Sequence, residues 1–397
     1  MQVVISGNCL GTIQNLIHDG DKFTWSNDIP DNSWLFGFEN AKRDIGLVAT
    51  AAKYELSTFE NTPHKRSMDT IFGDKDVNIP WMHVMPRVMF NKQLLSLLDQ
   101  LWCVINENHD QYYMNQFVSN RGLLMGLQEP HIDVPALKQV VRDSGLKRGE
   151  VLKFMPASGN VSPKSSYSQI GSITGRLVID SGPNILTLKR ENRRILKSRF
   201  KGGKIVQIDI SSLEPRIALS FAGKDSPDDI YEFVGNSVLE GTLTRAQVKI
   251  AVLSCMYGAS AWSLSKQIPK EFNAKKILSD IKRYFKIKAL QEKLSAESSK
   301  LGYIKNLYGR KIFSKESSVN HFLQSSGVDV SFDIFLQIIK DLNKDNIDFV
   351  PIYVIHDALV IDVSKDGYDR VIEITNKSYK TDNLDCIFPV KVEIIKE

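Results

Sequence analysis

The sequence predicts an α+β protein with more than one lobe. Its 397 residues are more than a single hydrophobic core usually organises. Residues 86–128 and 242–300 carry apolar side chains at helical spacing, with a break near Pro269. Residues 203–211 and 351–364 show the alternating or continuous apolar pattern of strands.

Composition narrows the class of protein. Apolar residues make up 42% of the chain and charged residues 24%, as in ordinary globular proteins. No apolar run approaches the roughly 18 residues of a membrane span, and the N-terminus lacks the zones of a signal peptide. Four widely spaced cysteines match no zinc or disulfide framework. We therefore expect a cytoplasmic protein without membrane contact, and its net charge of +5 permits a polyanionic partner.

Positive charge is concentrated in residues 138–204. This segment has many Lys and Arg, few acids, and interspersed Ser, Gly and Asn. Cations of this kind bind phosphates, while small polar groups and backbone amides position them. The segment therefore indicates either a surface that follows a nucleic acid or a flexible basic linker.

The segment around 203–211 predicts a strand that leads into a helix. The following residues read "SSLEPRIALSFAG", in which Ser211 or Ser212 can cap the helix and Pro215 fits its first turn. Asp209 lies at the end of the predicted strand.

The segment 351–364 predicts a hairpin with a carboxylate at its tip. Two apolar runs are interrupted by His356 and Asp357. If this hairpin neighbours the strand that ends at Asp209, both acids project at one edge of a sheet. They could then hold two Mg²⁺ ions about 4 Å apart for phosphoryl transfer. For either acid alone, a capped turn or a surface charge is the alternative.

The segment 242–260 places four side chains on one helical face. Arg245, Lys249, Leu253 and Tyr257 recur every four residues, so they share a broad stripe. One interpretation is an amphipathic helix with a solvated basic end. The other is a pair of fixed cations for the phosphates of a triphosphate.

Six short motifs follow one another along the second half of the chain. They read "TGRLVIDSGPN" (174–184), "DISSLEPRIALS" (209–220), "RAQVKIAVLSCMYGAS" (245–260), "GYIKNLYGRKI" (302–312), "NHFLQSSGVD" (320–329) and "VIHDALV" (354–360). In this order and spacing they resemble the polymerase region of family A DNA polymerases, the bacterial DNA polymerase I group and its phage relatives. The resemblance covers residues 171–397.

The resemblance implies a right-hand architecture with a palm built on an antiparallel sheet, helical fingers and a thumb. The expected parts are a small N-terminal region of unknown role (1–80), the thumb (81–170), the first part of the palm (171–224), the fingers (225–300) and the second part of the palm (301–397).

The resemblance also implies roles for individual residues. Those at the reaction centre are Asp209 and Asp357 as metal ligands and Lys249 as a general acid toward pyrophosphate. Those at the nucleotide are Arg245 and Lys249 on the triphosphate, Glu214 against the sugar where it excludes a 2′-hydroxyl, Leu253 beneath the sugar, and Tyr257 at the templating base. Those at the DNA are Arg176, Gly258, Asn320, Gln324 and His356.

Five positions depart from the pattern of the family. Ala358 replaces an acid after His-Asp, and Leu253 replaces an aromatic residue. Glu316 stands where an arginine is usual, Leu186 where a glutamine is common, and Tyr231 where a histidine is frequent. We expect an active but divergent enzyme.

The resemblance implies a DNA-templated DNA polymerase that extends a primer with dNTPs and uses two Mg²⁺ ions. Its partners would be primer-template DNA and dNTPs, with or without a processivity or replisome protein. The compact, divergent sequence suggests a phage enzyme. A single-subunit RNA polymerase remains an alternative, although Glu214 argues against it. An inactive polymerase-like DNA-binding subunit is another, suggested by Ala358 and Glu316.

We expect no proofreading 3′→5′ exonuclease in this chain. In this family that activity begins with an Asp-X-Glu motif on a strand, and residues 1–80 contain none. The region has no definite pattern, and we interpret it as a structural cap or a remnant of a lost domain rather than a separate activity. Its acids lie in polar, turn-rich surroundings; among them are Asp19, Asp21, Asp28, Asp31, Glu39 and Asp44.

Overall fold

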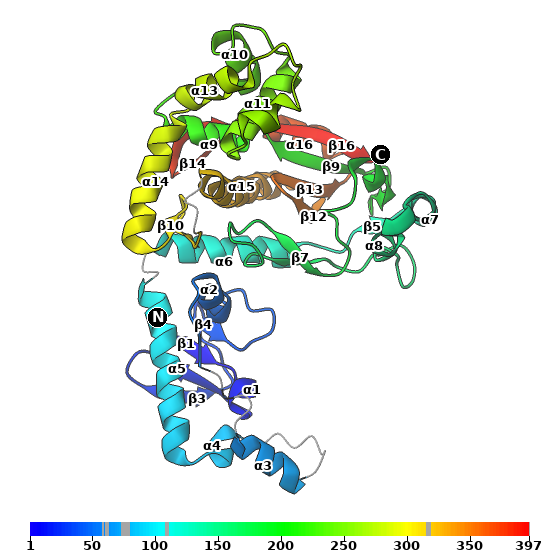
Figure 1. Ribbon diagram of the computed structural model, residues 1–397. Helices are drawn as coiled ribbons and strands as arrows, with labels where there is room; N and C mark the ends of the chain where they lie inside the picture. The colour runs from blue at the N-terminus through cyan, green and yellow to red at the C-terminus, as the bar shows by residue number, and fades with distance from the viewer. Residues whose placement is uncertain (58, 60–62, 73–79, 108–110, 315–318, 397) are drawn as a thin grey trace. The chain divides into compact units, whose positions relative to one another are not determined.

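The protein has an α+β fold, as the sequence predicts (Figure 1). It forms two compact units, Met1–Met125 and Gly126–Glu397. This division does not mark the boundaries between thumb, palm and fingers, which stay predictions. The computed structural model describes residues 1–57, 59, 63–72, 80–107, 111–314 and 319–396.

The first unit combines a four-stranded sheet with helices. Its strands lie in the order β3-β2-β1-β4, where β1 is antiparallel to β2 and parallel to β4. The helical prediction for residues 86–128 is confirmed by α5 and α6, while its residues 108–110 lie outside the described ranges. The elements are β1 (Val3–Ile5), α1 (Gly7–Leu10), β2 (Asn15–His18), β3 (Phe23–Ser26), β4 (Trp34–Phe36), α2 (Ile45–Ala51), α3 (Pro63–Phe72), α4 (Trp81–Val84), α5 (Arg87–Glu107) and α6 (Gln111–Gly126).

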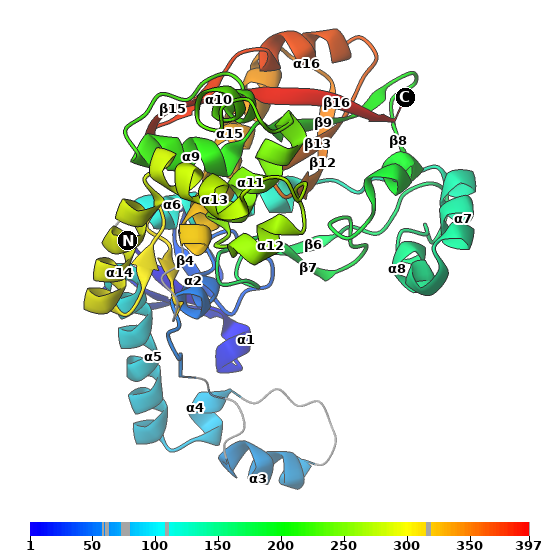
Figure 2. The same cartoon turned by 45° about the horizontal axis from the view of Figure 1, so that its top comes forward.

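An antiparallel sheet forms the centre of the second unit (Figure 2). Its strands lie in the order β12-β13-β9-β16, and every neighbouring pair is antiparallel. The predicted strand becomes β9 and the predicted hairpin becomes β12 and β13. The strands are β9 (Lys204–Ile210), β12 (Phe349–Ile355), β13 (Ala358–Val363) and β16 (Val390–Lys396).

Helices surround this sheet and supply one side of a cleft. The prediction of largely helical structure in residues 242–300 is confirmed by α11 to α14, and no helix covers 266–273 around Pro269. Helix α9 packs on the long helix α15, and α11 contacts both α9 and α10. The helices are α7 (Val134–Asp143), α8 (Arg148–Leu152), α9 (Leu213–Phe221), α10 (Ile230–Ser237), α11 (Arg245–Met256), α12 (Ala261–Ser265), α13 (Ala274–Tyr284), α14 (Ile287–Leu301), α15 (Val319–Lys344) and α16 (Tyr368–Thr375).

Short strand pairs and turns of 3-10 helix complete the second unit. None of the helices in the described ranges is long and apolar enough to cross a membrane. The remaining elements are β5 (His131–Ile132), η1 (Gly145–Lys147), β6 (Ser166–Ser168), β7 (Val178–Ser181), η2 (Arg190–Ile195), β8 (Leu196–Lys197), β10 (Ile304–Lys305), β11 (Lys311–Ile312), β14 (Tyr379–Thr381) and β15 (Leu384–Phe388).

Candidate active site

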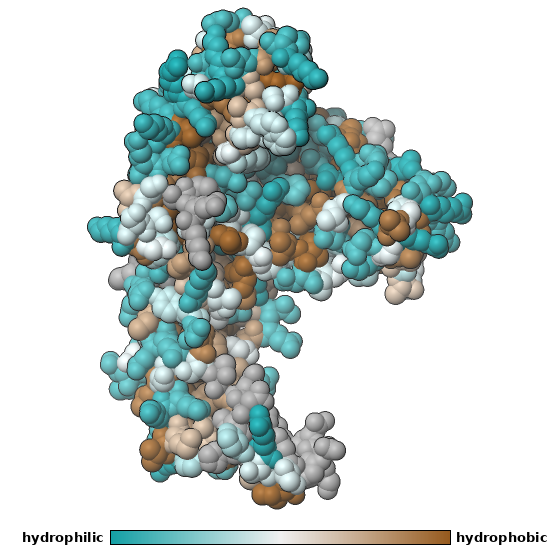
Figure 3. All heavy atoms as spheres, viewed as in Figure 1, coloured by the Kyte–Doolittle hydropathy of each residue, from teal (hydrophilic) through white to brown (hydrophobic). Residues whose placement is uncertain are grey.

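A cleft in the second unit gathers side chains from several segments of the chain. Its volume is about 440 Å³. Its lining comes from residues 176–177, the end of β9 and start of α9, residues 228–231, α11, α15, the β12–β13 turn and the start of β16. In the space-filling view the surface is hollowed beneath α10, α11 and α13, and hydrophilic side chains border the hollow (Figure 3).

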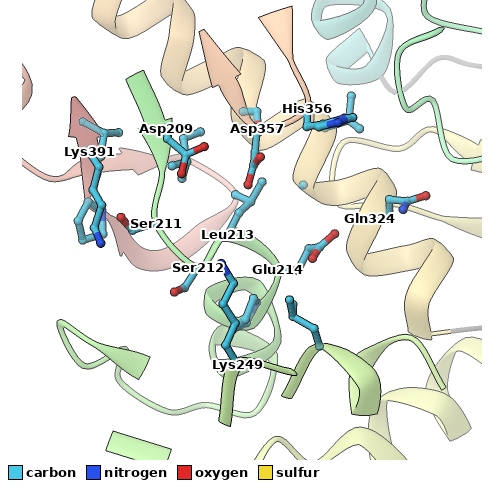
Figure 4. Close-up of a pocket in the computed structure, with 18 of the residues that line it drawn as sticks. Asp209, Ser211, Ser212, Leu213, Glu214, Lys249, Gln324, His356, Asp357 and Lys391 are labelled. Carbon is cyan, nitrogen blue, oxygen red and sulfur yellow. The ribbon is translucent and has the colours of Figure 1, made fainter. Parts of the chain in front are cut away.

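The two predicted acids meet in this cleft. Asp209 is the penultimate residue of β9, and Asp357 lies in the turn between β12 and β13. Asp209 is directly opposite Ala358 in the sheet, and the amide of Ile210 donates a hydrogen bond to the carbonyl of Asp357 at 3.1 Å. Both carboxylates therefore lie at one edge of the sheet, side by side (Figure 4).

The two carboxylates share a partly desolvated environment. Burial, followed by the negative charges of Asp357 and Glu393, raises the pKa of Asp209 to about 7. Burial also raises the pKa of Asp357, while the positive charge of Lys249 acts in the opposite direction on both acids. Two close carboxylates with raised pKa values are suited to a divalent cation, which would offset both burial and repulsion.

The donor set fits Mg²⁺ better than softer metals. Carboxylate oxygens are the ligands that this ion prefers, and it commonly keeps water or substrate phosphate in its remaining positions. Within the described ranges, no third His, Cys, Asp or Glu joins Asp209 and Asp357 to form a larger metal-binding cluster. The remaining ligands would therefore come from backbone carbonyls, water or substrate.

The turn that carries Asp357 is held by an arginine. His356 has a positive φ of 56°, an uncommon conformation for a residue with a side chain. Its Nδ1 lies 3.1 Å from a guanidinium nitrogen of Arg176. Burial and the charge of Arg176 lower the pKa of His356, so the neutral ring accepts this hydrogen bond. Arg176 and His356 thus lie at the same edge of the sheet as the acids.

The four side chains that recur every four residues along α11 face the cleft. Arg245, Lys249, Leu253 and Tyr257 all line it. The helix begins with a capping box at Thr244, which fixes the direction of its first turn.

The two cations of this stripe lie over one buried aromatic ring. The guanidinium carbon of Arg245 is 5.6 Å and the amine of Lys249 5.9 Å from the centre of the Tyr231 ring. Arg245 also forms an ion pair with Asp229 at 2.6 Å. Tyr231, the departure from a histidine, therefore packs against both cations.

A hydrogen bond joins Glu214 to Tyr257 across the cleft. The tyrosine hydroxyl donates to Oε2 of Glu214 at 2.9 Å, linking the first turn of α9 to the end of α11. Burial raises the pKa of Glu214, and the hydrogen bond from Tyr257 opposes this change. Gly258 follows with φ of 70° and open space around its α-carbon, so backbone conformation rather than crowding favours glycine there.

The predicted DNA-contacting residues of α15 have different surroundings. Gln324 lines the cleft, and its Oε1 accepts a hydrogen bond from Thr174 at 2.8 Å. Asn320 lies one turn earlier on α15 and is not part of the cleft lining. Among the departures, Ala358 is buried beside Asp209, whereas Glu316 lies outside the described residues.

Sequence reasoning missed three charged residues of the cleft. Asp228 and Asp229 precede α10, and Lys391 lies on β16. The side chain of Asp229 caps α10. An acid directly before an apolar run predicts a helix start, so the sequence could have indicated this cap. No local signal marked Lys391, because only the pairing of β16 with β9 brings it to the site.

A carboxylate pair on an antiparallel sheet, faced by cations from a helix, is the arrangement expected of a phosphoryl-transfer enzyme. Comparison with known families agrees: the family described as DNA polymerase family A matches residues 150–396. This match covers more than half of the chain, and the protein belongs to that family.

Individual relatives and a solved structure give the same result. The chain is 28% identical over 292 residues to DNA polymerase I of Aquifex aeolicus, covering 66% of this chain and 50% of the relative. It is 26% identical over 254 residues to DNA polymerase I of Pseudomonas aeruginosa, covering 55% and 27% respectively. It thus spans half or less of the length of these relatives.

The fold is similar to that of a solved polymerase domain. This is the POL domain of Pol1 from M. smegmatis, in complex with DNA primer-template and dNTP. The TM-score is 0.64 at 14% identity, with 99% of this chain and 94% of that chain covered.

Proposed function

We propose that this protein is a DNA-templated DNA polymerase that extends the 3′ end of a primer with dNTPs. The observation that carries the proposal is the pair Asp209 and Asp357, adjacent at one sheet edge and opposed by Lys249 in a single cleft. Membership of DNA polymerase family A supports the same reaction.

In the proposed mechanism the acids bind metal and the fingers bind phosphate. Asp209 and Asp357 would hold two Mg²⁺ ions, which supply charge that activates the primer 3′-hydroxyl and stabilises the leaving pyrophosphate. The primer hydroxyl would lose its proton to water as it attacks the α-phosphate in line, and the bond between the α- and β-phosphates would break. Lys249 would bind the leaving pyrophosphate and give it a proton. Arg245 would exchange its ion pair with Asp229 for the triphosphate.

The residues between the acids and α11 would select the nucleotide. Glu214 is half-buried and held by Tyr257, so its carboxylate cannot easily move away from a sugar placed above it. A 2′-hydroxyl would meet this group, which favours dNTPs over NTPs. Leu253 would pack beneath the sugar, and Tyr257 would lie near the templating base.

The remaining predicted contacts would bind the duplex. Arg176 and His356 are hydrogen-bonded to each other beside Asp357, where a primer terminus would have to lie for attack. Gln324 lines the cleft from α15 and would contact the duplex, with Asn320 one turn away. Gly258 would allow the template to pass the end of α11.

Primer extension on a defined template tests the proposal. Asp209→Asn and Asp357→Asn are each expected to abolish extension, because each removes a metal ligand. Binding of primer-template without metal is expected to be retained or improved, because a negative charge near phosphates is lost. The exposed Asp180→Asn serves as a matched control. Extension by either site variant at the wild-type rate would exclude the two-metal assignment.

The same assay separates the alternatives. Efficient incorporation of NTPs would identify a single-subunit RNA polymerase instead. A wild-type protein that binds primer-template but extends it with neither dNTPs nor NTPs would be the inactive DNA-binding subunit.

We further propose that this chain lacks proofreading. Asp19 accepts hydrogen bonds from the amides of Asp21 and Lys22, and Asp44 caps α2 by accepting from Leu47, so these acids already act in turns and caps. Incubation with Mg²⁺ and a 3′-mismatched primer, without nucleotides, should leave the primer intact. Shortening of the primer that is lost in an alanine series across the acids from Asp19 to Asp44, but not in Asp209→Asn, would overturn the proposal that the chain lacks proofreading.

The setting of the reaction is part of the proposal. We propose that the enzyme acts in a cytoplasm, that of a host cell if a phage encodes it, where DNA and dNTPs are both present. A processivity or replisome partner is a further part of the proposal. Product length per binding event, measured with a DNA trap, tests whether the isolated protein needs one.

A further inference from the structure

Strand β16 brings a lysine into the cleft that none of the six motifs contains. Lys391 lies directly opposite Asp209 in the antiparallel pairing of β16 with β9. Ala358 lies opposite Asp209 on its other side, in β13. Residues that face each other in an antiparallel pair project from the same face of the sheet. Ala358, Asp209 and Lys391 therefore form one row, and both charged residues line the cleft.

The ammonium of Lys391 is available to a ligand. Its strand neighbours are engaged: Glu393 pairs with Arg190, and the amine of Lys396 lies 3.7 Å from a carboxylate oxygen of Asp133. Lys391 is exposed, and it makes no ion pair with any residue that the structure describes. Among the lysine and glutamate side chains of β16, it is thus the one left without an ionic partner in the described ranges.

The amides of Leu213 and Glu214 begin α9 at this place, although Glu214 also adds a negative charge and Pro215 has no amide hydrogen. Ser212 precedes the helix in a left-handed conformation, and its side chain does not cap the first turn. The amides of a first helical turn lack partners within the helix and carry partial positive charge. Ser211 and Ser212 line the cleft, and Lys391 extends alongside Ser211, on the side of Asp209 away from Asp357 (Figure 4).

The wall of the cleft that faces the sheet, formed by α11 and the start of α10, supplies less free positive charge than the sequence of α11 implies. Arg245 is paired with Asp229, and Asp228 adds another carboxylate to the lining. A triphosphate carries several negative charges, so a further cation on the sheet side would complement Lys249.

We infer that Lys391 is a nucleotide-binding residue that contacts the outer phosphates of the incoming nucleotide and the pyrophosphate product. The α-phosphate must lie at the acids where the bond forms. Lys391 lies beyond Asp209, on the side away from Asp357, and so it meets the β- and γ-phosphates. The identity of this ligand rests on the proposed polymerase function; the phosphate chemistry rests on the geometry of the cleft.

Single-nucleotide incorporation tests this inference in three variants. Lys391→Met is expected to weaken dNTP binding about tenfold, the usual worth of one charge-assisted contact to phosphate. Lys391→Arg should restore most of this loss. Lys396→Met removes the same charge from the same strand outside the cleft, and it should leave dNTP binding unchanged. The affinity for primer-template should change by less than about twofold in all three, because the contact is with the nucleotide.

Two kinetic outcomes would overturn the inference. The first is equal dNTP affinity in Lys391→Met and Lys396→Met. The second is a loss of primer-template affinity as large as the loss of dNTP affinity, which would make Lys391 a contact of the DNA backbone.

A binding measurement keeps the inference separate from the proposed reaction. Titration calorimetry with inorganic pyrophosphate and Mg²⁺ requires no turnover, and Lys391→Met should bind this probe about tenfold more weakly than Lys396→Met. If the wild type extends no primer but this difference is found, the polymerase proposal fails while the phosphate site stands. If the wild type extends primers and the two variants bind pyrophosphate equally, the assignment of Lys391 fails alone.

Discussion

Removal of a catalytic carboxylate should stabilise the metal-free protein. Burial and the charges of Asp357 and Glu393 raise the pKa of Asp209 from 3.8 to about 7. The folded state therefore binds a proton more tightly than the unfolded state, and stability is lost as pH rises from about 4 to about 7. The difference of about three units between the two pKa values corresponds to about 4 kcal/mol of stability. Screening by solvent in the open cleft reduces this to about 1–2 kcal/mol.

Asp209→Asn removes the cost of ionising a partly buried carboxyl group without changing the shape of the side chain. For a unit of this size, about 1–2 kcal/mol corresponds to a rise in Tm of about 3–6 °C at pH 8 in EDTA. The gain should shrink at pH 5 and vanish only below about pH 3, where the wild-type carboxyl is protonated in both states. Mg²⁺ should then stabilise the wild type more than the variant, because the metal binds the carboxylate only in the folded state.

Thermal unfolding followed by circular dichroism at pH 4, 5 and 8, with EDTA or Mg²⁺, measures these effects. Asp180→Asn, an exposed acid, is the control and should show none of them. An Asp209→Asn protein that is no more stable than the wild type at pH 8 in EDTA would refute the reasoning. A gain that is equal at all three pH values would refute it too, since the cause would not be ionisation.

Three further predictions concern other residues of the cleft. Lys249→Ala should lower the rate of incorporation about a hundredfold while barely changing primer-template affinity, as rapid-quench kinetics and fluorescence anisotropy can measure; equal losses would support a merely solvated basic face. Asp229→Asn keeps a good cap but releases Arg245, so dNTP affinity should rise about threefold with little change in Tm; a weaker affinity would indicate that Asp229 positions Arg245. In competition assays, Glu214→Ala should raise the ratio of NTP to dNTP incorporation at least about tenfold, and Tyr257→Phe should raise it less. An unchanged ratio in Glu214→Ala would exclude Glu214 as the group that discriminates between the two sugars.

The local elements of the second unit could be read from the sequence because their causes are local. The strand that becomes β9 and the hairpin of β12 and β13 show β periodicity over a few residues, and α11 shows helical periodicity. These patterns act between neighbours along the chain, so no tertiary information is needed. The α+β class and the helical segments followed from the same patterns.

The sheet of the first unit could not be predicted from the sequence, and the reason is also local. Its strands β1 to β4 are only three or four residues long. A strand of this length contains too few alternations to distinguish it from an irregular segment. Its parallel pair, β1 with β4, is formed by segments separated by the two intervening strands, and nothing in either segment specifies that pairing.

The chemistry of the site was partly a property of the sequence and partly of the fold. Asp209, Asp357 and Lys249 could be chosen from the sequence because strand ends, a hairpin tip and a helical stripe place them at predictable points of their own elements. Which of these elements lie together could not be derived locally, since strand register is decided by the packing of segments far apart in the chain. The tertiary structure alone therefore paired Asp209 with Ala358 on one side and Lys391 on the other, bound Arg245 to Asp229, and buried the acids enough to raise their pKa values.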